Sequence, residues 1–201
     1  MHEESESPDL QPEAILAAYR QGYFPMAEHR HGLVHWYTAD PRTIIPLDAF
    51  HRGRNLRRSL RRREFALTIN TAFDDVIRSC AEREETWISD AIIRAYATLH
   101  RRGHAHSVEC WNEGMLAGGL YGVSIGGAFF GESMFSRREN ASKVALAALV
   151  ERLRERRFLL LDSQFMNEHM RQFGAIEIPR SAYLALLGRA VSADTDFLGV
   201  A

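Results

Sequence analysis

Two short segments hold carboxylates beside groups that can bind and orient an amine. Glu132 lies in Gly131–Ser136, where its neighbours are glycine, serine and large apolar side chains. Asp162 and Gln164 come directly after the apolar run Phe158–Leu161. A carboxylate accepts hydrogen bonds and a carboxamide both donates and accepts them, so such groups can hold an amine that enters a reaction.

The surroundings of Glu132 predict a carboxylate that needs a partner. Side chains alternate between the two faces of a strand, so Phe130, Glu132 and Met134 are expected to share one face. An unpaired charge on an apolar face is costly, and a cationic ligand would be a suitable partner. The alternative is an edge-strand glutamate that faces solvent.

Asp162 and Gln164 are expected at the C-terminal end of a buried strand. They are two residues apart, which places both side chains on the same side of that strand. Loops at such strand ends often carry the functional sites of α/β sheets. The alternative is that Asp162 only caps the helix that follows.

Positive charge is concentrated in one segment. The whole chain has 25 Lys and Arg against 26 Asp and Glu, a net charge of −1, whereas residues 51–63 contain seven arginines and no acid. Five of these arginines follow helical spacing and so share one helix face: Arg54, Arg57, Arg58, Arg61 and Arg62. Arginine binds phosphate bidentately, so the segment predicts a polyanionic partner. A solvated surface helix is the alternative.

Aromatic side chains recur in the loop regions. Trp and Tyr can stack on exposed nucleobases, although each one taken singly fits core or interface packing better. The residues are Tyr23, Phe24, Trp36, Tyr37, Trp87 and Trp111.

Length and composition fit one globular domain, or one domain with a small appendage. The chain has 201 residues, of which 46% are hydrophobic and 25% charged. Its two cysteines, Cys80 and Cys110, exclude a disulfide scaffold and lack zinc-ligand spacing. No apolar run reaches the ~18 residues that a membrane span needs. A soluble cytoplasmic protein is therefore expected.

The elements that would position these residues follow an α+β order. Hydrophobic periodicity predicts helices over residues 12–22, 48–63, 71–83, 89–103, 140–157, 167–174 and 180–191. It predicts strands over 44–47, 65–70, 106–111, 114–127, 128–136, 158–164 and 175–179, with a short hairpin or irregular structure around 34–38. We expect one mixed central sheet flanked by helices.

This order resembles that of the GNAT acyltransferase superfamily. The Gly-rich pyrophosphate loop that the resemblance implies is missing, because Ser136–Lys143 stands in its place; an acyl-CoA donor is therefore not expected. The turn at Ala39–Pro41 is the candidate boundary between a small N-terminal subdomain (1–41, of which 1–11 are expected to be flexible) and a GNAT-like domain (42–201).

Nine segments together resemble the leucyl/phenylalanyl-tRNA–protein transferase family and keep its order. They are Ala18–Pro25, Trp36–Arg42, Thr86–Ile88, Gly103–Glu109, Gly118–Val123, Gly131–Ser136, Glu139–Lys143, Leu161–Gln164 and Glu177–Arg180. The resemblance covers roughly residues 14–190, and the Gly-Glu-Ser-Met-Phe-Ser, Glu-Asn-Ala-Ser-Lys and Asp-x-Gln series is its most specific part.

The resemblance implies a reaction. The family transfers Leu or Phe, and Met more weakly, from aminoacyl-tRNA to the N-terminal amine of proteins that begin with Arg or Lys. The new N-terminus marks the protein for degradation through the N-degron pathway. No metal and no CoA are implied as cofactors.

The resemblance also assigns roles to residues. Asp162, Gln164 and Glu132 match the catalytic positions. The aminoacyl side-chain pocket would be lined by Phe129, Met134, Leu120, Leu149 and Leu161. The 3′-terminal adenosine would meet Trp87, Met26 and Trp36, with Met26 standing where the family usually has Trp. The arginine helix would bind tRNA phosphates.

Two alternatives remain open beside this interpretation. One is a GNAT-type N-acyltransferase that uses another acyl donor. The other is a non-catalytic tRNA-binding module built on the arginine helix.

Overall fold

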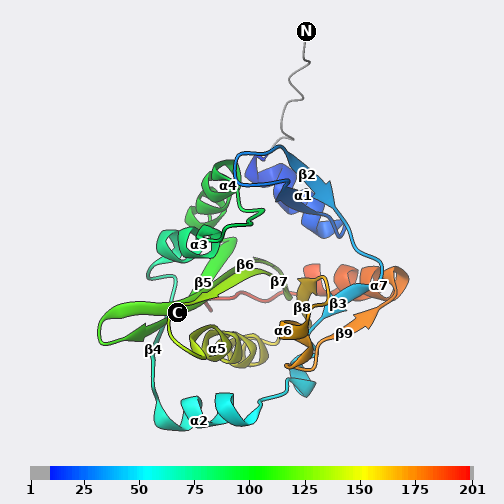
Figure 1. Ribbon diagram of the computed structural model, residues 1–201. Helices are drawn as coiled ribbons and strands as arrows, with labels where there is room; N and C mark the ends of the chain where they lie inside the picture. Colours follow the sequence, from blue (N-terminus) through cyan, green and yellow to red (C-terminus); the bar gives the residue numbers. More distant parts are fainter. Residues whose placement is uncertain (1–9, 200–201) are drawn as a thin grey trace.

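The computed structural model describes residues 10–199 and contains one large mixed sheet with helices on both sides (Figure 1). The strands are β1 Phe24–Ala27, β2 Val34–Tyr37, β3 Arg42–Ile44, β4 Ala66–Ile69, β5 Ala105–Asn112, β6 Met115–Ile125, β7 Ala128–Ser136, β8 Leu160–Gln164 and β9 Ile176–Ile178. The helices are α1 Pro12–Arg20, α2 Arg54–Arg62, α3 Phe73–Ala81, α4 Asp90–Arg101, α5 Ala141–Glu155, α6 Glu168–Arg171 and α7 Arg180–Val191, with a 3₁₀ turn at Leu47–Ala49.

Seven strands form the large sheet in the order β4-β5-β6-β7-β8-β3-β9. The antiparallel meander β5-β6-β7 is confirmed, and β7 pairs with β8 in parallel. The hairpin expected around residues 34–38 is confirmed as well, because β1 and β2 form a separate two-stranded antiparallel sheet. The predicted α+β class with a mixed central sheet is therefore confirmed.

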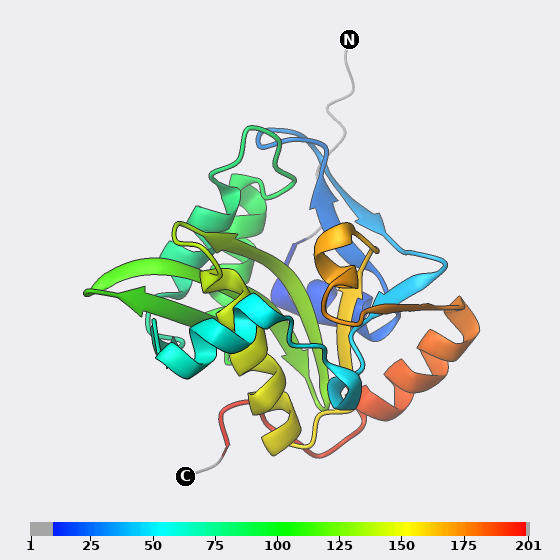
Figure 2. The same cartoon turned by 60° about the horizontal axis from the view of Figure 1, so that its bottom comes forward.

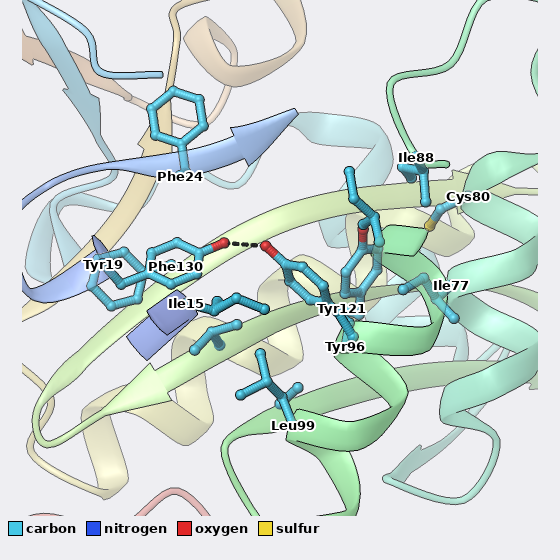
Figure 3. Packing of buried hydrophobic residues seen from close by; sticks show 14 of the residues in the cluster. Ile15, Tyr19, Phe24, Ile77, Cys80, Ile88, Tyr96, Leu99, Tyr121 and Phe130 are labelled. Atoms are coloured by element: carbon cyan, nitrogen blue, oxygen red, sulfur yellow. Dashed lines mark hydrogen bonds between the residues drawn. The ribbon is translucent and has the colours of Figure 1, made fainter. Parts of the chain in front are cut away.

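Two apolar cores cover the two faces of the large sheet. The first takes Ile15 from α1, Ile77 from α3, Tyr96 from α4 and Leu187 from α7, and Figure 3 shows much of this cluster. The second core contains the inner side of α5 together with Leu56 of α2. Figure 2 shows α2 lying across α5, on the side of the sheet opposite α4. The site described below lies where these two cores approach each other.

The predicted helix over 48–63 begins later than expected. Asp48 lies in the 3₁₀ turn, and α2 starts at Arg54 behind Gly53. Between them the Phe50 ring stacks on Phe173 with centroids 5.6 Å apart, which holds the intervening chain out of helical conformation. The strand expected over 44–47 is likewise displaced to β3, because Pro46 cannot donate a ladder hydrogen bond.

A β-bulge interrupts the pairing of β6 and β7 at Glu132. Tyr121 and Gly122 are neighbours on β6, but their partners on β7 are Ser133 and Gly131. Glu132 is thus an extra residue on β7, and alternation changes phase there.

The expectation that Phe130, Glu132 and Met134 share one face is therefore wrong. Phe130 belongs to the first core, whereas Met134 packs against the second. Phe129 and Phe130 alternate between the two cores before the bulge, and Met134 and Phe135 do so after it, so Glu132 is the residue at which the alternation changes phase.

Within residues 10–199, no helix is both long and apolar enough to cross a membrane. Most of the segment expected to be flexible, residues 1–9 of 1–11, lies outside the described residues. The boundary at residue 41 stays a prediction.

Candidate active site

The site forms where two parallel strands diverge. β7 and β8 pair only as far as Phe130 opposite Asp162, although both strands continue beyond that point. Glu132 and Gln164 follow on the two diverging strands, and Gln164 Nε2 donates a hydrogen bond of 3.3 Å to Glu132 Oε1. A cavity of about 680 Å³ opens there and reaches both faces of the sheet.

The cavity is apolar on the side of the second core. Four of the five residues predicted for the side-chain pocket line it: Leu120, Met134, Leu149 and Leu161. Phe129 does not, because it is fully buried and packs its ring on Phe197 at 5.3 Å. Ile45 and Leu146 complete this part of the wall.

Polar side chains surround the opening of the cavity. Arg83, Arg137, Asn167 and His169 line it. Burial, together with the nearby positive charges of Lys143 and Arg83, lowers the pKa of His169. The Nε2 atom of His169 lies 3.2 Å from the Met134 sulfur.

Glu132 is held by hydroxyl groups from two helices. Tyr19 of α1 donates to Oε1 at 2.7 Å, and Tyr96 of α4 donates to Oε2 at 3.3 Å. The two tyrosine hydroxyls also lie within hydrogen-bond distance of each other, as the dashed line in Figure 3 marks. Each hydroxyl carries one proton, so the two tyrosines can donate only two of these three hydrogen bonds at one time. Burial raises the pKa of Glu132 to about 7, because hydrogen bonds from the tyrosines only partly offset the loss of solvation.

Asp162 forms a buried ion pair below the site. The guanidinium of Arg42 donates to both carboxylate oxygens, with Nε 2.9 Å from Oδ1 and Nη2 2.8 Å from Oδ2. Tyr183 adds a hydrogen bond of 2.7 Å to Oδ2. All three side chains are within 1% of full burial, and Asp162 is at the same time one of the residues that line the main cavity.

Asp162 is connected to the site by a hydrogen bond from the main chain of Gln164. The Gln164 N–H donates to Asp162 Oδ1 at 3.0 Å, and Gln164 has a left-handed φ of 56°. A non-glycine residue in that region is strained and needs fixed contacts. The ion pair thus orients the carboxamide, while the carboxamide itself bonds to Glu132.

Only two of the three residues predicted to contact the terminal adenosine line the same cavity. Met26 and Trp87 line a second, smaller cavity of about 150 Å³ beside the main one. Trp36 lies on β2 opposite Pro25 and is not among the residues that line it. Phe165, which no sequence pattern singled out, lies in the wall instead.

The five arginines of α2 are exposed, while Leu56 and Ser59 face inward. Among the described residues, Arg62 alone of the five forms an ion pair, at 3.8 Å to Glu64. The face is therefore a cluster of largely uncompensated positive charge.

Sequence reasoning missed the residues that hold the site together. Tyr19, Tyr96 and Tyr183 were indistinguishable from other apolar positions of amphipathic helices, and Arg42 stood in a turn-rich segment. The available signal was the residue type, because a tyrosine buried in a helix usually brings a hydrogen bond for its hydroxyl.

A mixed sheet that opens at a carboxylate and a carboxamide, beside an apolar pocket, fits an enzyme that acts on an amine. A family model described as leucyl/phenylalanyl-tRNA protein transferase matches residues 44–188, and the model of the corresponding N-terminal domain matches residues 8–40. The chain belongs to the leucyl/phenylalanyl-tRNA protein transferase family and is an aminoacyltransferase, which confirms the resemblance seen in the sequence.

Curated relatives agree over nearly the whole chain. A leucyl/phenylalanyl-tRNA–protein transferase of Salinibacter ruber is 54% identical over 94% of this chain and 84% of its own length. One of Gloeobacter violaceus is 53% identical over 94% of this chain and 97% of its own. Among solved structures, a ribosomal-protein-alanine N-acetyltransferase from Brucella melitensis biovar Abortus 2308 overlaps 54% of this chain and 86% of its own, with 16% identity and a TM-score of 0.37. At that score it adds nothing to the assignment.

Proposed function

We propose that the protein transfers Leu or Phe, and Met more weakly, from aminoacyl-tRNA to the N-terminal amine of proteins that begin with Arg or Lys. The product carries a new apolar N-terminus that acts as an N-degron. Because both substrates belong to the translating cell, the proposed location is the cytoplasm.

The shape of the main cavity supports the choice of amino acid. Its inner wall of Leu120, Leu149 and Leu161 offers only apolar contacts to a side chain. Burial of a Leu or Phe side chain in such a wall is favourable by roughly 1.5–3 kcal/mol. Under this proposal a side chain branched at Cβ is not accepted, because its extra methyl group would lie beside the reacting ester.

The reaction joins the acceptor nitrogen to the ester carbonyl carbon. The ester C–O bond breaks, the 3′-hydroxyl of the tRNA leaves, and the proton lost by the amine passes to the leaving oxygen. In this scheme the Gln164 carboxamide holds the attacking amine, and Glu132 accepts hydrogen bonds from it. Asp162 is a positioning residue, since Gln164 lies between it and the substrate.

The exposed arginines of α2 support the choice of acyl carrier. Apart from Arg62, which lies 3.8 Å from Glu64, their guanidinium groups form no ion pair within the described residues, and each can make bidentate contacts to phosphate oxygens. A tRNA acceptor stem is recognised through its shape and its phosphates, so a row of arginines on one helix suits it.

The observation that carries the proposal is the pairing of Glu132 and Gln164 at the mouth of an apolar cavity of about 680 Å³. A transfer assay tests it. Labelled Leu-tRNA, Phe-tRNA and Ile-tRNA are each offered to one peptide that begins with Arg and to a matched peptide that begins with Ala.

We expect label to move from Leu-tRNA and Phe-tRNA to the Arg peptide, and Gln164→Ala to reduce kcat at least 10-fold while tRNA affinity stays unchanged. Transfer from Ile-tRNA, or equal use of the Ala peptide, would contradict the assigned substrates. Full activity of Gln164→Ala would remove that residue from the mechanism.

A further inference from the structure

After α7, residues 192–199 run past the C-terminal end of α5 (Figure 2). Two arginines of that end hold the segment by its backbone. Arg152 Nε donates to the Phe197 carbonyl at 2.9 Å, and Arg156 Nε donates to the Asp196 carbonyl at 2.9 Å. These bonds place the Phe197 side chain in the second core, where it is only 1% exposed.

The Phe197 ring packs against two other rings of this core. It stacks on His106 of β5 with centroids 4.4 Å apart, and it meets Phe129 of β7 at 5.3 Å. The imidazole of His106 is fixed on both sides, because Asn70 Nδ2 lies 3.0 Å from Nδ1 and Ser124 Oγ lies 3.1 Å from Nε2. The Phe129 ring has no polar atom and is held by packing alone.

Phe129 stands between this segment and the main cavity. In the β7–β8 ladder it lies opposite Leu161, which lines the cavity. It also belongs to the same core as Leu120 and Leu149, two further residues of the cavity wall. Phe129 itself does not line the cavity, so it supports the wall from behind, as Phe197 supports Phe129.

Support of this kind affects which side chains fit the cavity. Protein interiors are closely packed, so a wall can retreat only where space is free behind it. Removal of a buried ring leaves a cavity that its neighbours fill in part. One methylene group more or less in an apolar pocket changes discrimination by roughly 10- to 200-fold. A small movement of Phe129 would therefore change the choice between Leu and a bulkier side chain.

We propose that Phe197 determines, through Phe129, how large an amino-acid side chain the main cavity accepts. The proposal rests on the proposed function for the identity of the donor. Phe197 is a positioning residue, because Phe129 and the cavity wall lie between it and the substrate. The alternative is that Phe197 only stabilises the second core, in which case its loss would weaken the binding of all side chains alike.

Binding of small donor analogues tests the proposal without turnover. Adenosine that carries Leu, Phe or 2-naphthylalanine through a stable 3′-amide is titrated into the wild type, Phe197→Leu and Phe197→Ala by calorimetry. Phe73→Leu is the matched control, because Phe73 is also buried and stacks on a histidine, His100 at 4.2 Å, but in the first core. Melting temperatures of all variants are measured alongside.

We expect Phe197→Ala to raise the affinity ratio of the naphthylalanine to the Leu analogue by about 10-fold. Phe197→Leu should shift the ratio in the same direction by a smaller factor, and it carries the test if Phe197→Ala does not fold. Phe73→Leu should keep the wild-type ratio. In Phe129→Leu/Phe197→Leu the second substitution should add little to the effect of the first, because the ring that would retreat is absent.

In the transfer assay, Phe197→Leu should raise kcat/KM for Phe-tRNA relative to Leu-tRNA, with the KM for the peptide unchanged. An unchanged affinity ratio in Phe197→Leu with a lowered melting temperature would overturn the proposal, as would an equal shift in Phe73→Leu. If the wild type transfers nothing but the ratio of analogue affinities depends on Phe197, the proposed function fails while this inference stands.

Discussion

Glu132 holds its carboxylate among two tyrosine hydroxyls and the carboxamide of Gln164. A single residue thereby connects α1, α4 and the end of β8. The sequence analysis predicted that the Glu132 carboxylate needs a partner. The partners in the structure are neutral hydrogen-bond donors and not a cation. Such an arrangement leaves the carboxylate only partly stabilised, which is why its pKa is raised to about 7 rather than lowered.

A pH-dependent stability follows from this residue. The ordinary pKa of a glutamate in the unfolded chain is 4.5, against about 7 for Glu132 in the folded protein. Between these values the unfolded chain loses its proton first, so the contribution of Glu132 to stability falls as pH rises from 4.5 to about 7 and is level above that. Glu132→Gln has no proton to lose and should not show this fall.

Urea unfolding of wild type and Glu132→Gln at a series of pH values across that window measures the effect. As the pH rises through this window, the free energy of unfolding of Glu132→Gln should increase relative to that of the wild type. Glu139→Gln serves as the control, because Glu139 is exposed. Parallel curves for wild type and Glu132→Gln would show that the folded protein does not raise this pKa.

At the scale of elements, two local irregularities build the site. The bulge at Glu132 turns its side chain toward the first core, and the left-handed Gln164 ends β8 beside it. Gly122 permits the bulge, because a Cβ there would lie 2.3 Å from the Phe130 carbonyl oxygen. Neither irregularity follows from hydrophobic alternation, which assumes an unbroken strand.

Helix α2 gives a prediction about salt dependence. The double variant Arg57→Gln/Arg61→Gln should weaken tRNA binding and reduce the slope of log affinity against log salt by up to about 2, close to one unit for each lost phosphate contact. Glutamine keeps a good helix former at both positions. Filter binding over a range of salt concentrations measures this slope.

The matched control is Arg94→Gln/Arg101→Gln, which removes the same charge from exposed positions of α4. That helix lies on the other side of the sheet, so the control should leave the slope nearly unchanged. Equal effects of the two double variants would mean that tRNA responds to net charge and not to α2.

Over the whole molecule, Arg42 connects parts of the chain that are distant in sequence. Besides the pair with Asp162 on β8, its Nη1 donates to the Gly22 carbonyl at 3.1 Å. Its guanidinium also lies 4.6 Å from the ring centroids of both Phe24 and Tyr183. The segment after α1, the central sheet and α7 thus meet at one buried cation, directly beneath Gln164.

Removal of this cation should strongly destabilise the fold. Arg42→Met leaves Asp162 buried without its charge partner, which costs about 3–5 kcal/mol, a large part of the roughly 5–15 kcal/mol that stabilises a typical domain. The double variant Arg42→Met/Asp162→Asn removes both charges and should be more stable than Arg42→Met alone. Denaturant unfolding gives all these values.

Arg20→Met at the exposed end of α1 is the control and should change stability little. The single variant Asp162→Asn completes the cycle. If Arg42→Met/Asp162→Asn loses as much stability as Arg42→Met and Asp162→Asn added together, the two side chains are not coupled in the folded protein.

The element order, the meander and the family can be read from the sequence alone. Local periodicity and turn residues encode the first two, and the short series at Gly131–Ser136, Glu139–Lys143 and Leu161–Gln164 encode the last. Each of these patterns lies within a few neighbouring residues, so it can be recognised in the sequence before the fold is known.

Which side chains meet at the site, and how strongly each is buried there, depends on the tertiary structure. Phe129 and Trp36 do not line the two cavities, whereas Phe165 lines the smaller one. Asp162 is buried against Arg42. Burial also raises the pKa of Glu132. The reason is that long-range pairing, desolvation and a bulge depend on what packs across the sheet, and no local pattern records that partner.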